Sequence, residues 1–164
     1  MAIKQKQRGF TLLMAVIFMS VMLAFGLALG SLSYKQQVLA SSSIESQYAF
    51  YAADAGLECA LYADQQQNLF AYPSSDPGSA PKTSCSGSLP ISASEAWTTS
   101  QWVIANRLSL DAGTRCVDIT VYKLNPADSG SIHTYIFSQG YDVSCTTVAE
   151  GGARFVARGI DAEY

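Results

Sequence analysis

The chain reads KQRGFTLLMA at residues 6–15, where a short basic stretch meets a glycine, a phenylalanine and then a long apolar run. Residues 9–34 carry no charged side chain, whereas basic residues precede the run and Lys35 follows it. As a helix, roughly 26 residues at about 1.5 Å each exceed a hydrocarbon core of about 30 Å. Basic residues concentrate on the cytoplasmic side, so we expect the chain beyond Lys35 to be exported. The sequence predicts a single-pass anchor in the inner or cytoplasmic membrane, with a cytoplasmic N-terminus.

Two other kinds of N-terminal segment have a similar composition. A secretory signal peptide has an apolar region of about 7 to 15 residues, closed by a small-residue cleavage site. The apolar run here is about twice that length, although the small residues at 28–30 and 40–42 resemble such sites. An ordinary uncleaved anchor is the second alternative.

The junction Arg8-Gly9-Phe10-Thr11-Leu12-Leu13 resembles the processing site of the type IV pilin and pseudopilin family. In that family a membrane peptidase cleaves after the glycine and methylates the new N-terminal phenylalanine. The resemblance implies cleavage between Gly9 and Phe10, N-methylation of Phe10, and an apolar helix that stays in the mature protein. The implied partners are other pilin subunits through the N-terminal helix, the prepilin peptidase, an inner-membrane assembly platform and membrane lipid. The implied destination is an extracellular filament.

Met14 departs from the family's pattern, because most members have a glutamate at this fifth mature position. That glutamate is thought to pair inside the membrane with the amino terminus of a neighbouring subunit. A carboxylate at mid-bilayer costs about 2.5 to 3.5 kcal/mol on insertion scales, so it is kept where it has a partner. The family's tip-type minor subunits often lack it, so Met14 favours a role at the tip or in initiation. The alternative is a divergent subunit that tolerates methionine anywhere along a filament.

Gly26 and Gly30 form a GxxxG pair within the apolar run. Such pairs let membrane helices approach closely, and glycine weakens a helix by about 1 kcal/mol relative to alanine. Filaments of the family are thought to melt this part of the helix on assembly, which both glycines would ease. Glycine is also common in spanning helices generally.

Residues 35–64 continue the helical signal without a proline, and Gly56 is their one glycine. A stripe at three- and four-residue steps is predicted to be buried; it comprises Val38, Glu45, Tyr48, Ala52, Ala55, Cys59 and Tyr62. One surface of the predicted helix carries unusually small side chains, so that a sheet or another helix can pack close to it. This surface comprises Ala49, Ala52, Ala53, Ala55 and Gly56. The segment AFYAADAGLE at residues 49–58 resembles the exported half of the long helix in PilX-type minor pilins. Its two acids, Asp54 and Glu58, lack a nearby histidine or third acid, so we expect a solvated face or contacts with a neighbouring subunit rather than a metal site.

Residues 65–110 are predicted to be a variable, loop-rich region, since proline, glycine, serine and aspartate crowd residues 72–81. Residues 94–110 are predicted to form a short helix that presents Trp97 and Trp102, with the core as the favoured location of both rings. By analogy with the family, this region is the candidate contact surface.

Residues 111–164 are predicted to form an antiparallel sheet. Residues 116–122 alternate, with Val117, Ile119 and Val121 on one face. A turn at residues 125–130 leads to a second strand at 134–145, with Tyr135, Phe137, Tyr141 and Val143 on one face, and a third strand follows at 154–160. The predicted fold class is α+β: a basic leader at residues 1–9, then a long helix packed on a small sheet. The helix has an assembly half at residues 10–34 and an exported half at 35–64, as in pilins.

Four cysteines lie on the predicted exported side, where an oxidising compartment makes disulfides the default. Four cysteines allow three connectivities, and the sequence alone does not choose between them. A hairpin that turns near Gly130 favours Cys116–Cys145 and leaves Cys59–Cys85. Strict alternation, however, points Cys116 and Cys145 to opposite faces, so a bulge or a different pairing is needed. Without a CxxC pair, a zinc site is a poor alternative.

No catalytic group stands out, so we expect neither an enzyme nor a cofactor. His133 is the only histidine, and no nucleophile elbow or phosphate-binding glycine loop is present. The net charge of −3 and the scattered arginines argue against nucleic-acid binding. The expected function is therefore that of a minor type IV pilin-like subunit, a structural component of a surface filament. The alternatives are a pseudopilin of a type II secretion or DNA-uptake machine, and a membrane-anchored binding protein that never polymerises.

Overall fold

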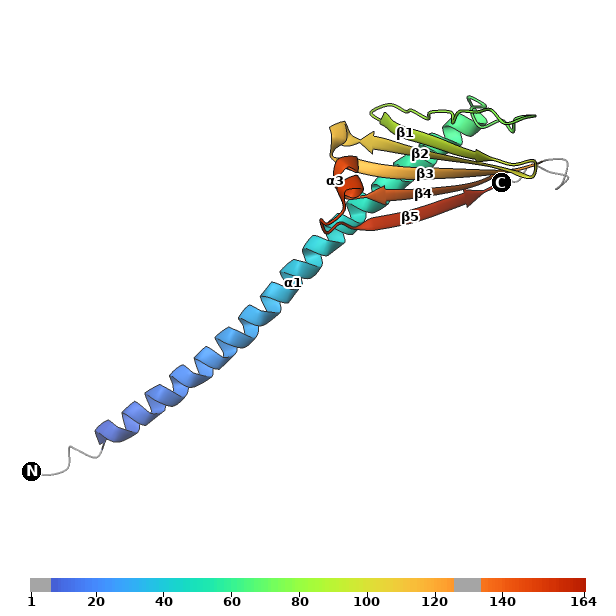
Figure 1. The fold of residues 1–164 in the computed structure, drawn as a ribbon. Helices are drawn as coiled ribbons and strands as arrows, with labels where there is room; N and C mark the ends of the chain where they lie inside the picture. The colour runs from blue at the N-terminus through green and yellow to red at the C-terminus, as the bar shows by residue number, and fades with distance from the viewer. Residues whose placement is uncertain (1–6, 126–133) are drawn as a thin grey trace, which may run out of the picture. The chain divides into compact units, whose positions relative to one another are not determined.

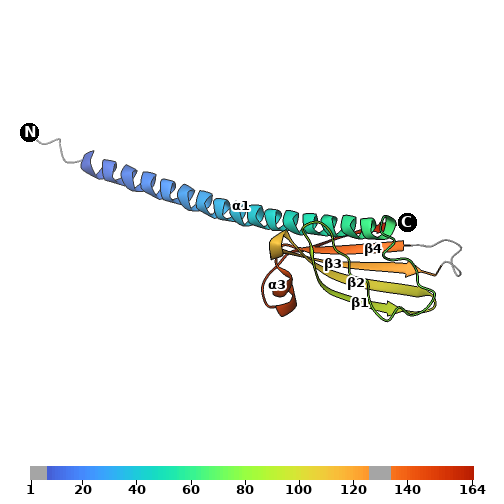
Figure 2. The same cartoon turned by 90° about the horizontal axis from the view of Figure 1, so that it is seen from above.

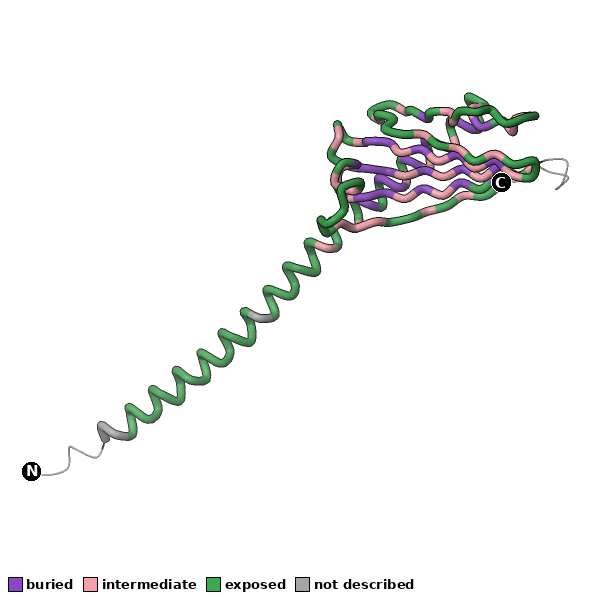
Figure 3. The backbone as a smooth tube through the Cα atoms, in the orientation of Figure 1, coloured by how far each residue is buried: buried purple, intermediate pink, exposed green. Residues whose placement is uncertain are grey.

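The computed structural model describes residues 7–125 and 134–164, and the chain forms two compact units, residues 1–42 and 43–164. Helix α1, Gln7–Gln65, contributes to both units. In the first unit, every side chain that the structure describes between Phe10 and Ser41 is exposed, as Figure 3 shows in green. The long N-terminal helix that the sequence predicts is present.

The second unit contains one five-stranded antiparallel sheet in which each strand pairs with the next along the chain. Its strands are β1 (Leu89–Trp97), β2 (Gln101–Leu110), β3 (Arg115–Leu124), β4 (Thr134–Tyr141) and β5 (Ala157–Glu163) (Figure 1). A short 3₁₀ helix, η1 (Asp111–Gly113), joins β2 to β3, and helix α3 (Cys145–Glu150) lies between β4 and β5. Within this unit, the end of α1 runs along one face of the sheet (Figure 2). The predicted α+β class is confirmed.

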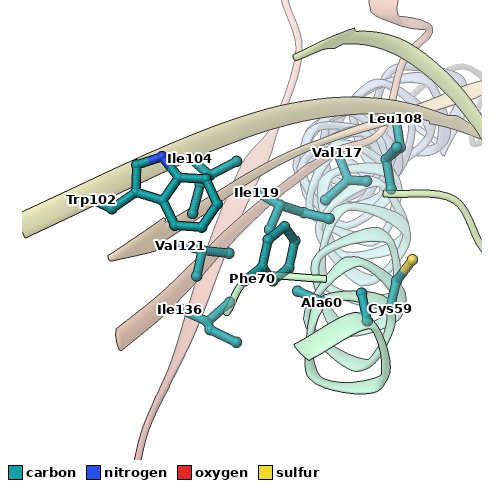
Figure 4. Packing of buried hydrophobic residues seen from close by; sticks show 11 residues of the cluster. Cys59, Ala60, Phe70, Trp102, Ile104, Leu108, Val117, Ile119, Val121 and Ile136 are labelled. Atoms are coloured by element: carbon teal, nitrogen blue, oxygen red, sulfur yellow. The ribbon is translucent and has the colours of Figure 1, made fainter. Parts of the chain in front are cut away.

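The hydrophobic core lies between α1 and the sheet. The strands contribute alternate residues to it, as expected for one buried face, and the predicted inward face of β3 is confirmed. Figure 4 shows these side chains with Phe70, which enters from the segment that follows α1. The large side chains that are fully buried in it are Phe70, Ile104, Leu108, Val117, Ile119, Val121 and Ile136. Burying each such side chain contributes about 1.5 to 3 kcal/mol.

Helix α1 approaches β4 so closely that the two backbones touch at Gly140. A Cβ atom on Gly140 would overlap the carbonyl oxygen of Ala49 and the amide nitrogen of Ala53. Nearby, the Oγ of Ser138 donates a hydrogen bond of 2.7 Å to the carbonyl oxygen of Ala53. A Cβ on Gly56 would likewise overlap Val117 of the sheet. The small surface of α1 therefore packs against the sheet, as predicted, although its Ala55 is exposed.

The wider stripe predicted for burial on α1 is largely wrong. Ala52 and Cys59 are buried, but Val38, Tyr48 and Tyr62 are exposed. Val38 belongs to the first unit, in which no described side chain before Ser42 is covered. In the second unit, the short distance between helix and sheet admits only small residues, so the large tyrosine rings remain outside.

The short helix predicted over residues 94–110 is also wrong, because this segment forms the end of β1, from Ser94 to Trp97, and the whole of β2. The sheet thus begins at Leu89, inside the region predicted to be loop-rich. In β2, alternate residues from Trp102 onward are buried. The pattern is hidden in the sequence because Val103 and Ala105 are apolar too, although they lie on the opposite face. Trp102 is a core residue, as favoured, whereas Trp97 is half-buried.

Strand β4 presents the opposite face to the core from the one predicted. Ile136, Ser138 and Gly140 are buried, while Tyr135 and Phe137 point to the other face. The contact with α1 explains this choice, because it requires a small side chain and a glycine at the positions nearest the helix. The strand ends at Tyr141, before the predicted limit at residue 145, and β5 covers Ala157–Glu163 rather than 154–160. Most of the predicted turn at 125–130, and His133, lie outside the described residues.

Gly140→Ala should lower the free energy of unfolding of the second unit by about 3 kcal/mol, because the new methyl group meets helix backbone that cannot rotate away. The measurement is urea unfolding of the full chain in non-ionic detergent, followed by tryptophan fluorescence. Gly30→Ala is the matched control, since a Cβ there meets nothing within 4 Å. Equal stability of the two variants would contradict the close helix–sheet contact.

Candidate functional site

The apolar part of α1 is the first candidate site. From Phe10 onward, this helix is long and apolar enough to cross a membrane, judged by its length and composition. Its large side chains, Phe10 and Met14 among them, are exposed. An exposed surface of this kind needs lipid or another apolar surface to cover it. The segment is therefore compatible with a single membrane anchor.

The predicted processing residues, Gly9 and Phe10, and the predicted assembly residues all lie along this helix. Gly9 lies in the first turn of α1, directly before Phe10. Gly26 and Gly30 lie one helical turn apart, and a Cβ on either would meet nothing within 4 Å. The pair thus leaves a strip of helix backbone on which another helix could pack.

The two disulfides of the second unit join the predicted pairs, Cys59–Cys85 and Cys116–Cys145. Strict alternation would have pointed Cys116 and Cys145 to opposite faces of the sheet, but it does not apply to Cys145. Strand β4 ends at Tyr141, and Cys145 begins α3. The described pairing of β3 with β4 contains no bulge. Each bond closes a loop of fewer than 30 residues, for which the chain-entropy estimate is about 3 kcal/mol of stabilisation.

The Cys116–Cys145 bond lies on the face of the sheet opposite α1, in a second small core beneath α3. Tyr141 is buried there and packs edge-on against Phe155, with ring centroids 5.6 Å apart. This core secures the end of the sheet where β3 begins and β4 ends.

Beside this second core, a charged pair links β2 to β3. The Nε and Nη2 atoms of Arg107 donate hydrogen bonds of 2.6 and 2.7 Å to the two carboxylate oxygens of Asp118. The hydroxyl of Tyr141 donates a third hydrogen bond, of 3.1 Å, to Asp118. The hydrogen bonds that Arg107 donates to Asp118 raise the pKa of Arg107. Burial, with the negative charge of Asp118, raises the pKa of Tyr141 to about 12. The three groups satisfy one another, which is typical of a structural cluster.

A buried polar cluster joins the other end of the sheet to the end of α1. The Nζ of Lys123 lies 2.5 Å from a carboxylate oxygen of Asp64 and donates a 2.8 Å hydrogen bond to the hydroxyl of Thr134. The hydroxyl of Tyr164 donates to the same carboxylate oxygen. Burial and this contact with Asp64 raise the pKa of Tyr164. The cluster thus ties α1, β3, β4 and the last residue of the chain together.

This cluster is absent from the sequence-based predictions, although the sequence carries a signal for it. The alternation that places Val117, Ile119 and Val121 in the core continues to Lys123. A lysine on a buried face requires an acidic partner. That partner, Asp64, lies 59 residues earlier in the chain, too far for a local pattern to identify it.

The candidate residues do not gather into one catalytic centre. Gly9, Phe10, Met14, Gly26 and Gly30 lie in the first unit, whereas both disulfides and the ion pairs Arg107–Asp118 and Lys123–Asp64 lie in the second. Where the structure describes the chain, no three histidine, cysteine, aspartate or glutamate side chains are placed to hold a metal ion. No family model, curated protein or solved structure matches the chain.

Lys123→Met should lower the free energy of unfolding by about 3 to 5 kcal/mol, because it leaves the carboxylate of Asp64 buried without its cation. The measurement is again urea unfolding of the full chain in detergent. The double variant Lys123→Met/Asp64→Asn removes both charges and keeps an acceptor for Tyr164, so it should recover at least half of the loss. A single variant as stable as the parent would show that the pair is not buried.

Proposed function

We propose that this chain is a minor type IV pilin-like subunit, a structural component of a surface filament that acts at its tip or in its initiation. The observation that carries the proposal is α1, in which one helix serves two purposes. Its first part, after the Gly9–Phe10 junction, is uncharged and exposed. Its last part packs on the sheet of a disulfide-bonded α+β unit. A subunit that is first held in lipid and later packed in a filament needs both parts.

The apolar segment supports the proposed assembly on energetic grounds. Between Phe10 and Leu32 there is no charged residue. The helix can therefore exchange lipid contacts for contacts with other helices without moving a charge out of water, which would cost several kcal/mol. Close packing at Gly26 and Gly30 would add van der Waals contact between helices.

The second unit supports the proposal by being self-contained. Its core, both disulfides and the ion pairs Arg107–Asp118 and Lys123–Asp64 are formed within residues 43–164. Such a unit can keep its fold on the membrane surface and in a filament alike. Disulfides also suit an exported location.

The N-terminus of the mature protein tests the proposal most directly. Purified from membranes of a host with a working prepilin peptidase, the chain should begin at N-methylated Phe10 by intact-mass and peptide analysis. Gly9→Leu, which alters the residue before the cleaved bond, should keep its leader and serve as the control. A mature chain that begins at Met1 would indicate a simple anchor, and one that begins beyond about residue 30 a secreted protein.

The two alternatives are separated by different observations. Cleavage after Gly9 distinguishes the pilin-like classes from a binding protein that never polymerises. Loss of piliation, of secretion or of transformation on deletion of the gene then distinguishes a pilus subunit from a pseudopilin of a secretion or DNA-uptake machine.

Met14→Glu tests the proposed position at the tip or in initiation. A glutamate there would offer a carboxylate to the amino terminus of a subunit above it, so the variant should enter the filament shaft or impair initiation. The measurement is the distribution of labelled subunits along filaments seen by microscopy, with Met14→Leu as the uncharged control. Identical distributions of the glutamate variant and the parent would remove the basis for a tip role.

A further inference from the structure

The face of the sheet that points away from α1 contains a hollow of about 490 Å³ near the end of β3 and the start of β4. This volume falls in the range of about 300 to 1,000 Å³ that is typical of small-molecule sites. Three of the lining residues form a row across neighbouring strands, because Tyr122 pairs with Tyr135 and Tyr135 pairs with Glu163. The lining residues that the structure describes are Gln101, Tyr122, Leu124, Tyr135, Phe137 and Glu163.

Aromatic rings make up much of this lining. The rings of Tyr122 and Tyr135 lie 5.7 Å apart between centroids and are tilted by 48°. The ring of Phe137 lies against the backbone of β5, since a Cβ on Gly159 would come within 2.9 Å of two ring atoms. Tyr135 and Leu124 are exposed, so the core does not use this apolar surface.

The described lining of the hollow carries a negative charge. Glu163 is the one charged residue among the described lining residues, and Asp161 lies two positions earlier on the same face of β5, opposite Phe137. In the described parts of the chain, neither carboxylate forms an ion pair. Lys123, the neighbour of Tyr122 in sequence, points to the opposite face and is bound to Asp64.

We propose that this hollow binds an organic cation, with an alkylated ammonium group held between the aromatic rings and the carboxylate of Glu163. The faces of aromatic rings carry partial negative charge and attract such cations by about 0.5 to 2 kcal/mol. The Glu163 carboxylate acts in the same direction at the rim. This binding does not depend on whether the chain enters a filament.

Other ligands fit this lining less well. A bare metal ion would require several oxygen ligands, whereas the lining supplies one carboxylate and one amide besides the tyrosine hydroxyls. A neutral sugar could stack on the rings, but it would make no use of the negative charge. An anion would be repelled by both Glu163 and Asp161.

Two sources present the proposed chemistry: a free small amine and the side chain of a lysine on another protein. Choline represents the first source and Nα-acetyl-lysine amide the second. The neutral isostere of choline, 3,3-dimethylbutan-1-ol, has the same shape without the charge. Comparison of choline with this isostere measures what the positive charge contributes.

The experiment is a ligand-observed NMR titration of the full chain in non-ionic detergent with each of the three compounds. Choline or the lysine derivative should bind, and the neutral isostere should bind about tenfold more weakly than choline. Glu163→Gln and Tyr135→Leu should each weaken binding of the cation by about fivefold or more. The matched controls, Glu58→Gln and Tyr51→Leu, change exposed residues on α1 and should leave binding unchanged.

Each result decides the proposal. Tighter binding of the lysine derivative identifies a protein side chain as the source, and tighter binding of choline identifies a free amine. The proposal is overturned if neither cation binds, if choline binds but no more tightly than its isostere, or if Glu163→Gln has no effect on the cation that binds. Unchanged tryptophan fluorescence, to which Trp97 and Trp102 both contribute, verifies that each variant is folded.

Discussion

The contact between the backbone of α1 and Gly140 of β4 is the constraint on which the second unit depends. A glycine in the strand and alanines on the helix allow an approach that no larger side chain permits. Ser138 uses the same proximity to donate a hydrogen bond to a helix carbonyl. Because the helix lies so near, its large residues must face away, which explains why Tyr48 and Tyr62 are exposed.

That close contact would be weak if the ends of the sheet were free to shift along the helix. Two links between α1 and the rest of the unit oppose such a shift, and a third holds the sheet to α3. The Cys59–Cys85 disulfide attaches α1 to the segment that precedes β1, and the Cys116–Cys145 disulfide joins β3 to α3. At the opposite end, the Lys123–Asp64 pair anchors β3 to the last turn of α1. A buried ion pair contributes little net stability but strongly disfavours any arrangement that separates its charges. The Lys123–Asp64 pair therefore fixes the position of the sheet along the helix.

The same constraint divides the sheet into two faces with different chemistry. The face toward α1 is packed with aliphatic residues and small polar groups. The opposite face receives the aromatic residues of β4, because the period of two sends Tyr135 and Phe137 outward whenever Ser138 and Gly140 point inward. The aromatic hollow beside Glu163 is thus a consequence of how the helix packs on the other side. A surface that the core does not use is available for binding.

The local sequence was sufficient to predict several features of this protein. The uncharged run from Gly9 to Tyr34 specifies a long apolar helix, and the alternation of Val117, Ile119 and Val121 specifies a strand with one buried face. Only the tertiary structure decided which face of β4 is buried, that residues 94–110 pair as strands, and that Lys123 meets Asp64. The physical reason is the same in each case. A local pattern records that one side of a segment is apolar, whereas the distance to the packing partner decides which residues fit on the covered side. That distance is set by residues far apart in the chain, such as Ala49 and Gly140.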